Sequence, residues 1–303
     1  MNLLEIENRL TEIVGAGSIR REEPMNLHTS FRIGGPADLF VEPAREEQLQ
    51  EMISFCHLNH VPVMIIGRGS NLLVSDAGIR GVVIRISDRM NQVTIKKDQV
   101  IAQAGVSLAS LSRTLLQHSM AGFEFAGGIP GTLGGALVMN AGAYGGELKD
   151  CTVSCRVITK EGTLNTLLLD DMDMGYRSSR LQRTKEVIVS AVLRLKKGNY
   201  RQIKFLMDDY WHRRITRQPY YLPSGGSVFK RPEGYFAGKL IEDCELKGVS
   251  IGGAMVSDIH AGFIVNNGDA TAADVVKLMT LIQQRVKKEY GVDLEPELRV
   301  VGE

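Results

Sequence analysis

The sequence predicts an α/β protein with a long strand-and-helix region followed by a shorter α+β region. Three observations support this. Residues 20–120 alternate short β-branched runs, such as 61–67, with amphipathic helical stretches, such as 46–60. The pattern changes at residue 199, where a long helix with a basic end begins. A Pro/Gly/Ser-rich stretch, 218–227, then interrupts regular structure.

The N-terminal region opens with a helix, since apolar side chains in residues 1–14 recur on one side. Further helices are expected at 46–60 and at 107–119, where Ser107 is a suitable N-cap. The expected strands share short apolar or alternating runs and lie at 37–43, 61–67, 81–86, 92–97, 100–105, 151–160, 163–169 and 186–197.

The C-terminal region is expected to contain three helices and a last strand. The helices are predicted at 200–216, 237–244 and 271–290, and the strand at 294–302. Thr271 and Asp274 form a capping pair, and Gly291 is a typical stop signal.

Composition restricts the class of protein. Of the 303 residues, 44% are hydrophobic and 23% charged, which is typical of a soluble globular protein. The net charge of +1 argues against a nucleic-acid partner. No apolar run reaches membrane-span length, and residues 1–14 lack the apolar core of a signal peptide. We therefore expect a cytoplasmic protein without membrane insertion.

The four cysteines indicate neither a metal site nor disulfides. They show no CxxC spacing, and we expect buried, reduced thiols and no bound metal.

A first glycine-rich turn follows the strand that ends at Gly67. Gly69, Ser70 and Asn71 then form a tight polar turn, whose successive N–H groups could make an anion nest. The turn matches neither the dinucleotide fingerprint GxGxxG nor the P-loop. Phosphate binding and a plain surface turn both remain open.

The second motif, GGIPGTLGGALVMNAGAYGG at 127–146, holds eight glycines. Pro130 and Asn140 exclude a membrane packing helix. It is either a purely structural loop or a cradle in which Gly128–Gly135 opens a short helix with N–H groups aimed at a phosphate. Two lysine-free glycine loops favour one diphosphate gripped from two sides, as in a large dinucleotide rather than ATP.

Arg177, Ser227 and Glu297 stand in three separate polar segments, 175–180, 223–232 and 294–302. Each is ambiguous alone, and Ser227 lacks the flanking pattern of a GxSxG nucleophile.

A basic helix end, residues 211–219, carries four potential cations. It is either a solvated surface or a diphosphate site, since arginine forks match phosphate oxygens. The four residues are His212, Arg213, Arg214 and Arg217.

Taken together, these segments resemble the UDP-N-acetylenolpyruvoylglucosamine reductase (UDP-N-acetylmuramate dehydrogenase) family over roughly residues 25–302. The resemblance rests on the order and spacing of HTSFRIGGPADLF, GRGSNLLVSDAGIRGVVIRI, GFEFAGGIPGTLGGALVMNAGAYGGEL, GYRSSR, PSGGSVFKRP, AGKLIEDCELKG, GGAMVSDIHAGFIVN and LEPELRVVG. The compact run from Gly234 to Leu294 resembles the shorter, second type of this family.

The resemblance implies a two-subdomain FAD-binding fold of the vanillyl-alcohol oxidase type, at 1–95 and 96–198, followed by an α+β substrate domain at 199–303. FAD should be non-covalent, because GRGSN holds no histidine or cysteine. The implied cofactor-binding residues are Gly67, Arg68, Gly69, Ser70, Asn71, Leu72, Gly128, Ile129, Pro130, Gly131, Gly134, Gly135, Asn140, Ala141 and Gly142.

The resemblance also implies a two-stage reduction in peptidoglycan precursor synthesis. NADPH gives hydride to flavin N5, which passes it to the vinyl CH₂ of a UDP-sugar enolpyruvyl ether. Arg177 and Glu297 would stabilise the enolate-like charge, Glu297 with a raised pKa, and Ser227 would protonate the neighbouring carbon. The implied substrate-binding residues are Tyr176, Arg213, Arg217 and Lys230.

Two further expectations follow. His260 should order its own turn rather than take part in the chemistry, and the protein should be a monomer. The alternative function is another FAD oxidase or dehydrogenase of the same superfamily acting on an alcohol. That alternative explains the glycine loops but not Arg177, Ser227 and Glu297.

Overall fold

The structure, a computed structural model, describes residues 2–303 and divides the chain into two compact units. Both are discontinuous. The first unit comprises residues up to 21, 38–68 and 81–212, and the second comprises 22–37, 69–80 and 213–303. The three segments expected from the sequence, 1–95, 96–198 and 199–303, stay a prediction.

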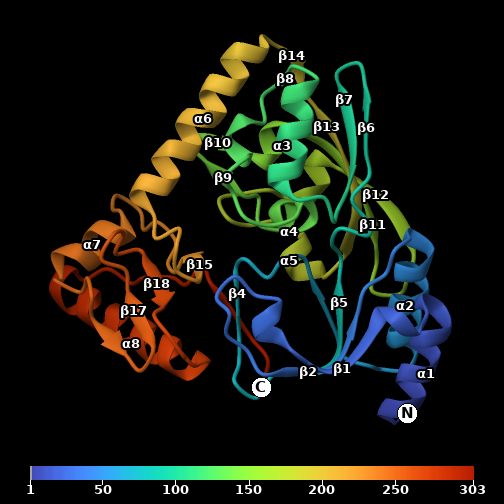
Figure 1. The fold of residues 1–303 in the computed structure, drawn as a ribbon, viewed down its shortest axis with the longest axis horizontal. Helices are drawn as coiled ribbons and strands as arrows, with labels where there is room; N and C mark the ends of the chain where they lie inside the picture. Colours follow the sequence, from blue (N-terminus) through green and yellow to red (C-terminus); the bar gives the residue numbers. More distant parts are fainter. Residues whose placement is uncertain (1) are drawn as a thin grey trace. The chain divides into compact units, whose positions relative to one another are not determined.

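Three helices of the first unit, α1, α3 and α4 in Figure 1, begin at a residue whose side chain caps the helix. Helix α1, Leu3–Val14, begins with a capping box in which the Asn2 side chain accepts from the Glu5 N–H at 2.9 Å. Helix α3, Leu108–Gln117, is capped by Ser107, as predicted, and buries Leu108, Leu111 and Leu115. The other helices are α2 (Glu46–Leu58), α4 (Leu133–Val138), α5 (Leu181–Thr184) and α6 (Tyr200–Arg217), the last of which continues past residue 212.

Two sheets form the framework of this part of the chain. A four-stranded sheet has the order β1-β2-β5-β3, from β1 (Ile19–Pro24), β2 (Pro36–Val41), β5 (Ile79–Arg85) and β3 (Val63–Ile66). An antiparallel five-stranded sheet has the order β12-β11-β13-β7-β6, from β12 (Leu164–Leu168), β11 (Thr152–Ile158), β13 (Val187–Arg194), β7 (Gln99–Gln103) and β6 (Val93–Lys96). Two short antiparallel pairs complete this part: the hairpin of β9 (Gly142–Ala143) with β10 (Gly146–Glu147), and the long-range pair of β8 (Met120–Ala121) with β14 (Lys196–Lys197).

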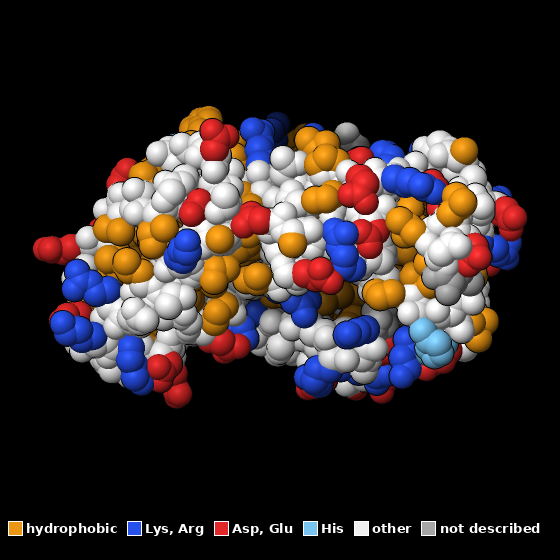
Figure 2. Space-filling model, turned by 90° about the horizontal axis from the view of Figure 1, so that it is seen from below, with side chains coloured by type: hydrophobic (Ala, Val, Ile, Leu, Met, Phe, Trp, Pro, Cys, Tyr) orange, Lys and Arg blue, Asp and Glu red, His pale blue; other side chains and the backbone are white. Residues whose placement is uncertain are grey.

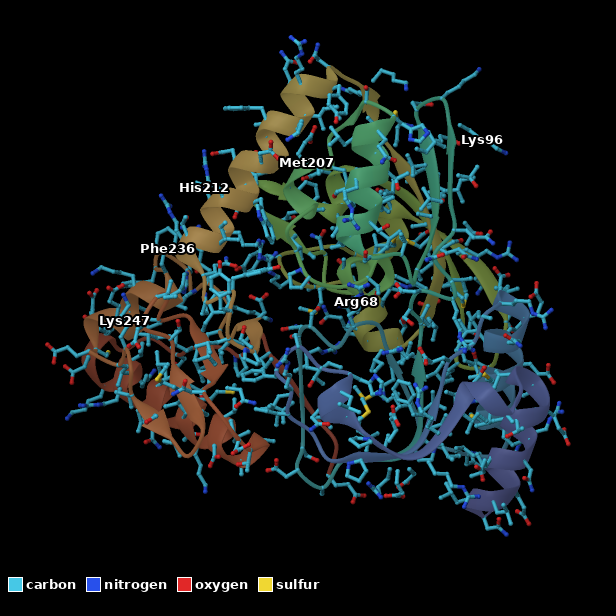
Figure 3. The ribbon with its side chains drawn as sticks, in the orientation of Figure 1. Arg68, Lys96, Met207, His212, Phe236 and Lys247 are labelled. Atoms are coloured by element: carbon cyan, nitrogen blue, oxygen red, sulfur yellow. The ribbon has the colours of Figure 1, made fainter. Side chains whose placement is uncertain are left out.

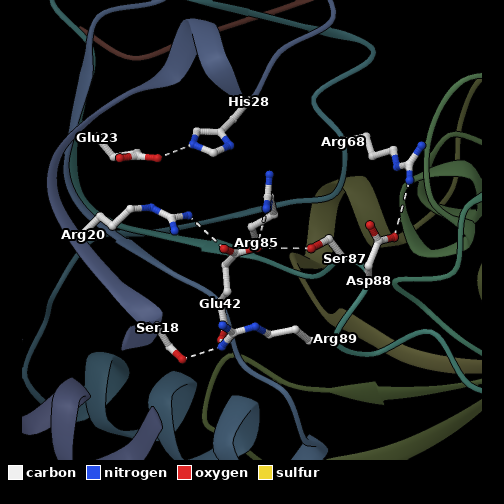
Figure 4. A network of polar contacts seen from close by, with 10 residues as sticks. All are labelled: Ser18, Arg20, Glu23, His28, Glu42, Arg68, Arg85, Ser87, Asp88 and Arg89. Carbon is white, nitrogen blue, oxygen red and sulfur yellow. Dashed lines mark hydrogen bonds and ion pairs between the residues drawn. The ribbon is translucent and has the colours of Figure 1, made fainter. Parts of the chain in front are cut away.

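A buried carboxylate, Glu42, anchors the strands of the first unit (Figure 4). Arg20 donates to its Oε2 at 2.8 Å, and Arg85 Nε donates to its Oε1 at 2.7 Å. Burial alone would raise the pKa of Glu42, but the hydrogen bonds from Arg20 and Arg85 lower it below its usual value. Glu42 therefore stays ionised although it is buried, because two guanidinium groups neutralise its charge.

The second unit places two helices against a small antiparallel sheet. The sheet order is β15-β18-β17-β16, from β15 (Ser224–Ser227), β18 (Phe263–Asn266), β17 (Ala254–Val256) and β16 (Ser250–Ile251). The helices are α7 (Ala237–Asp243) and α8 (Ala272–Tyr290). The predicted Thr271–Asp274 capping box and the left-handed Gly291 stop of α8 are confirmed.

Residues 69–80 and the last strand are tied together within the second unit. Strand β4 (Leu72–Val74) pairs in parallel with β19 (Arg299–Val301). The carboxylate of Asp76 accepts from the N–H groups of Ala272 and Ala273, at 2.7 and 3.0 Å, at the start of α8. An anion at a helix N-terminus satisfies donors that lack intrahelical partners.

The cysteines are free, and Cys56, Cys151 and Cys155 are buried, as predicted, while Cys244 is half-buried. Burial raises the pKa of each of the three buried thiols to about 12, so they stay protonated. Within residues 2–303, no cluster of His, Cys, Asp or Glu is suited to a metal, and no helix could span a membrane. Figure 2 shows acidic and basic side chains interspersed on the face drawn.

Candidate functional site

The two glycine-rich loops meet at Gly67. A Cβ on Gly67 would lie 2.3 Å from Thr132 Oγ1, so only glycine lets the chain directly after β3 approach the second loop this closely. Arg68 follows and donates to the Asp88 carboxylate at 3.4 Å (Figures 3 and 4). The expected apposition of the two glycine loops is therefore present inside the first unit.

The rest of the first loop belongs to the second unit. Gly69 has φ +59°, and a Cβ there would lie 2.2 Å from the His28 carbonyl oxygen. The Leu72 N–H donates to the Gly69 carbonyl at 3.4 Å, which closes the turn. The Asn71 side chain donates to the backbone carbonyl of Glu297 at 3.0 Å, so this loop also contacts a predicted catalytic residue.

In the second loop a short helix begins within Gly128–Gly135. Thr132 caps this helix, α4, which begins at Leu133. The N–H groups of Leu133 and Gly134 donate to the carbonyls of Val106 and Ala104, each at 2.9 Å. The Gly135 N–H points to Thr132 Oγ1 at 3.5 Å. The protein itself uses these donors, so within the expected Gly128–Gly135 cradle they are not available to a phosphate.

Other donors of the second loop suit an anion better. Among residues 2–303, no hydrogen bond engages the N–H groups of Gly128 and Gly131, while Ile129 donates to Ala126 and Pro130 has no N–H. Gly131 has φ +136°, a conformation that favours glycine. Backbone donors without side chains, beside a second glycine turn, fit the close approach of a dinucleotide pyrophosphate.

Helix α6 packs on the far end of the second loop. The Tyr144 ring stacks on that of Tyr210, with centroids 4.5 Å apart and planes 7° apart, and its hydroxyl donates to the Tyr210 carbonyl at 3.0 Å. A Cβ on Gly127 would lie 3.5 Å from Met207 Cε, and Figure 3 shows Met207 and His212 along this helix. Helix α6 therefore contacts the loop at Tyr144 and passes close to its first residue, Gly127.

Arg177 lies at the tip of a two-residue turn closed by Gly175 and Ser178. Its guanidinium donates to the Gly142 carbonyl at 2.9 Å and lies 5.1 Å from the Tyr176 ring centre. Hydrogen bonds from Lys149 and Asn140 lower the pKa of Glu147 against the opposing effect of burial, and the charge of Arg177 lowers it further. The second glycine loop therefore helps to fix the position of the Arg177 guanidinium, a predicted catalytic group.

Ser227 and Glu297 lie on neighbouring segments of the second unit. Ser227 is exposed and ends β15, after a register shift between Ser224 and Ser227, a stretch in which Gly226 has φ +83°. The half-buried Glu297 donates its N–H to the Val228 carbonyl at 2.8 Å. Phe229 forms an isolated antiparallel bridge with Pro296. Main-chain hydrogen bonds thus bring these two predicted residues into adjacent segments.

The predicted substrate-binding cations are at the surface. Arg213 and Arg217 are four residues apart on α6, so they share one side of the helix, and both are exposed. Lys230 is half-buried and forms an ion pair with Glu295. Tyr176 is exposed beside Arg177.

His260 behaves as predicted. Its Nδ1 accepts from the Gly262 N–H at 3.0 Å, two residues away, and burial lowers its pKa. A neutral imidazole that caps its own turn is a structural role.

Sequence reasoning missed two residues that help to hold the Arg177 turn. Gln182 contacts the turn directly and donates to the Arg177 carbonyl at 3.1 Å. Glu147 acts indirectly, because it accepts at 3.0 Å from Asn140, whose side chain also donates to the Gly175 carbonyl. A carboxylate directly after two glycines, in GGEL, is the sequence signal that could have drawn attention to Glu147.

Comparisons with known proteins agree with this geometry. Residues 37–167 match an FAD binding domain, and residues 218–301 match the C-terminal domain of UDP-N-acetylenolpyruvoylglucosamine reductase. The reductases of that name from Alkaliphilus metalliredigens and Clostridioides difficile are each 48% identical over 303 residues, covering 99% and 100% of this chain and all of the relatives. The crystal structure of the Thermus caldophilus enzyme superposes with a TM-score of 0.81 at 31% identity, covering 93% of this chain and 99% of that one.

The fold and the loops define an FAD-binding α/β flavoprotein with a C-terminal α+β domain, as predicted. The chain belongs to the UDP-N-acetylenolpyruvoylglucosamine reductase family and is a flavoprotein oxidoreductase.

Proposed function

We propose that this chain reduces UDP-N-acetylglucosamine enolpyruvate to UDP-N-acetylmuramate with NADPH, in cytoplasmic peptidoglycan precursor synthesis. Family membership supports the reaction class. The observation that carries the proposal is the hydrogen bond from Arg177 to the Gly142 carbonyl at 2.9 Å. It connects the cation expected to bind the substrate with the glycine loop expected to bind FAD. The chain would act as a monomer.

FAD, bound without a covalent bond, would supply the hydride-carrying chemistry between NADPH and the vinyl CH₂ of the substrate. The loops at Gly67–Leu72 and Gly128–Gly131 would hold its pyrophosphate, with backbone N–H groups such as those of Gly128 and Gly131 as donors. Arg213, Arg217 and Lys230 bind the UDP-sugar, because guanidinium and ammonium groups match phosphate oxygens. Tyr176 contacts the substrate beside Arg177.

The three predicted catalytic residues divide the remaining work. Arg177 binds the enolpyruvyl carboxylate and stabilises the negative charge that develops on it. Glu297, protonated, shares that task as a donor. The Ser227 hydroxyl gives its proton to the carbon next to the one that receives hydride, which completes the saturated product. A hydroxyl is a weak acid, but the carbanion is far more basic, so position matters more than pKa.

Ser227→Ala tests this division. Anaerobic mixing with NADPH should bleach the flavin at close to the wild-type rate. Reoxidation of the reduced holoenzyme by the enolpyruvyl substrate should slow by about 10²–10⁴-fold, the range for losing a general acid.

The matched control is Ser224→Ala in the same strand, which should reoxidise normally. An equal loss in both half-reactions of Ser227→Ala would refute the role of Ser227. Wild-type enzyme whose oxidised form is reduced by an alcohol but not by NADPH, and whose reduced form reacts with O₂ but not with the enolpyruvyl ether, would instead favour the alcohol-oxidising alternative.

A further inference from the structure

The backbone of Arg177 adopts a conformation that an arginine rarely takes. Gly175 and Ser178 exchange N–H···O bonds of 3.1 and 3.3 Å, and Arg177 between them has φ +51°. For a non-glycine residue the left-handed conformation costs about 1 kcal/mol or more, so the surroundings must hold it in place. The question is which groups do so.

The Asn140 side chain holds the base of this turn. It is fully buried, and its Nδ2 donates to the Gly175 carbonyl at 2.9 Å and to the Glu147 carboxylate at 3.0 Å. Its Oδ1 accepts from the Lys149 N–H at 3.0 Å. Both amide hydrogens are thus used inside the protein, and one of them is directed at the turn.

The Gln182 side chain holds the turn from the other side. Its Nε2 donates to the carbonyl of Arg177 itself at 3.1 Å and to the Val138 carbonyl at 3.0 Å. Val138 is the last residue of α4, and it also accepts from the Ser179 hydroxyl at 2.7 Å. Gln182 therefore links the backbone of Arg177 to the second glycine loop.

The guanidinium end is fixed by the same loop. It donates to the Gly142 carbonyl, and Gly142 pairs with Glu147 in the β9–β10 hairpin. The lowered pKa of Glu147 keeps a negative charge near the guanidinium. Backbone and side chain of Arg177 are thus attached to one short segment, residues 138–147.

We infer that Asn140 and Gln182 are positioning residues for Arg177, holding its strained turn so that the guanidinium meets the substrate carboxylate. This inference rests on the proposed function. Asn140 acts through the Gly175 carbonyl and Gln182 through the Arg177 carbonyl. Neither contacts the substrate. Misplacing a reacting group by about 1 Å can cost about 10²-fold in rate, so small shifts of this turn have large consequences.

Gln182→Met is the sharpest test, because Gln182 is half-buried and methionine keeps its length without a donor. In the FAD holoenzyme we expect normal flavin content and normal flavin reduction by NADPH. Reoxidation by the enolpyruvyl substrate should slow by about 10–10²-fold. Asn140→Asp removes both amide donors at equal size and should have a larger effect of the same kind.

A double mutant separates positioning from a general structural defect. If Gln182 acts through Arg177, then Gln182→Met in the Arg177→Lys background should slow reoxidation by less than about 2-fold more. The control is Gln202→Met, an exposed position on α6, which should behave as wild type.

The outcomes are distinct. The inference would be overturned if Gln182→Met were reoxidised at the wild-type rate. It would also be overturned if Gln182→Met slowed reoxidation as much in the Arg177→Lys background as in the wild type. Either result would leave the proposed function intact. Failure of wild-type reduced enzyme to react with the enolpyruvyl ether would overturn the proposed function and the inference with it. If Asn140→Asp does not fold, the Gln182 pair of measurements still decides.

Discussion

The Arg177 turn and the paired Ser227 and Glu297 segments are held by different kinds of interaction. The turn has a strained backbone and is held by side-chain amides. The segments of Ser227 and Glu297 are instead held next to each other by main-chain hydrogen bonds to Val228 and by the Phe229–Pro296 bridge. Side-chain amides can be removed by single substitutions, but a main-chain ladder cannot. The first region is therefore the more easily tuned, and the second is the more robust.

The largest effect is expected when strain and charge at Arg177 are removed together. Arg177→Gly should slow reoxidation by substrate by about 10²–10³-fold, as for the loss of one oxyanion-stabilising donor. The same change should raise the free energy of unfolding by about 1 kcal/mol, because glycine tolerates φ +51°. Stopped-flow kinetics and urea denaturation would measure the two effects.

Lys185→Gly is the matched control for strain, since Lys185 has φ +57° at the exposed end of α5. It should gain similar stability with unchanged reoxidation. A loss of stability in Arg177→Gly would show that the side chain, not the backbone, dominates the turn.

The next effect concerns stability of the first unit away from Arg177. Glu42→Gln should lower the free energy of unfolding at pH 7 by about 3 kcal/mol, which is the low end of the range for breaking a buried ion pair. The low end applies because the side chains of Arg20 and Arg85 remain partly exposed to water. The native pKa of Glu42 is lowered relative to about 4.3 in the unfolded chain. Its contribution is therefore complete above about pH 5 and is lost as the pH falls through the native pKa.

Denaturation curves of wild type and Glu42→Gln should thus converge in acid. A difference that stays constant down to pH 3 would contradict the assignment of the ionised form. Reoxidation of the folded variant should change little, because this network is separate from the amides that hold Arg177.

The smallest effect tests the second region. Gly225→Ala would place a methyl group 2.4 Å from Leu298 Cδ1 and 2.9 Å from Phe31, in a buried contact next to Glu297. We expect a loss of about 1–3 kcal/mol in the free energy of unfolding, as for overpacking.

Gly226→Ala is its neighbour and comparison. Nothing lies within 4 Å of a Cβ there, so only the φ of +83° opposes alanine, and the loss should be about 1 kcal/mol. Thermal melts that rank Gly226→Ala below Gly225→Ala in stability would contradict the packing account.

Much of the fold was predictable because its signals are local. The Ser107 and Thr271 caps, the Gly291 stop and the strand runs all depend on neighbours within a few residues. The parallel pairing of β4 with β19 joins residues 72–74 to 299–301, and no local sequence pattern predicts a pairing over this distance in the chain. The interleaved units were missed for the same reason.

The candidate site divides in the same way. Glycine density predicted two loops that act together, and the structure brings them close at Gly67 and Thr132. It could not predict that the N–H groups of Leu133 and Gly134 would be taken by the carbonyls of Val106 and Ala104, which come from another part of the chain. The positive φ of Arg177 is equally invisible, because arginine is not a residue that usually signals a left-handed turn.

The interleaving of the two units has a consequence for synthesis of the protein. Phe31, Ile33 and Leu73 belong to the buried cluster that also contains Val286 and Leu298. During translation the first three residues leave the ribosome long before the last two. The cores of the two units are therefore completed in a fixed order. The core of the second unit cannot be completed until β19 has been synthesised. Until then, these early apolar segments have no completed core to enter and are natural clients for chaperones.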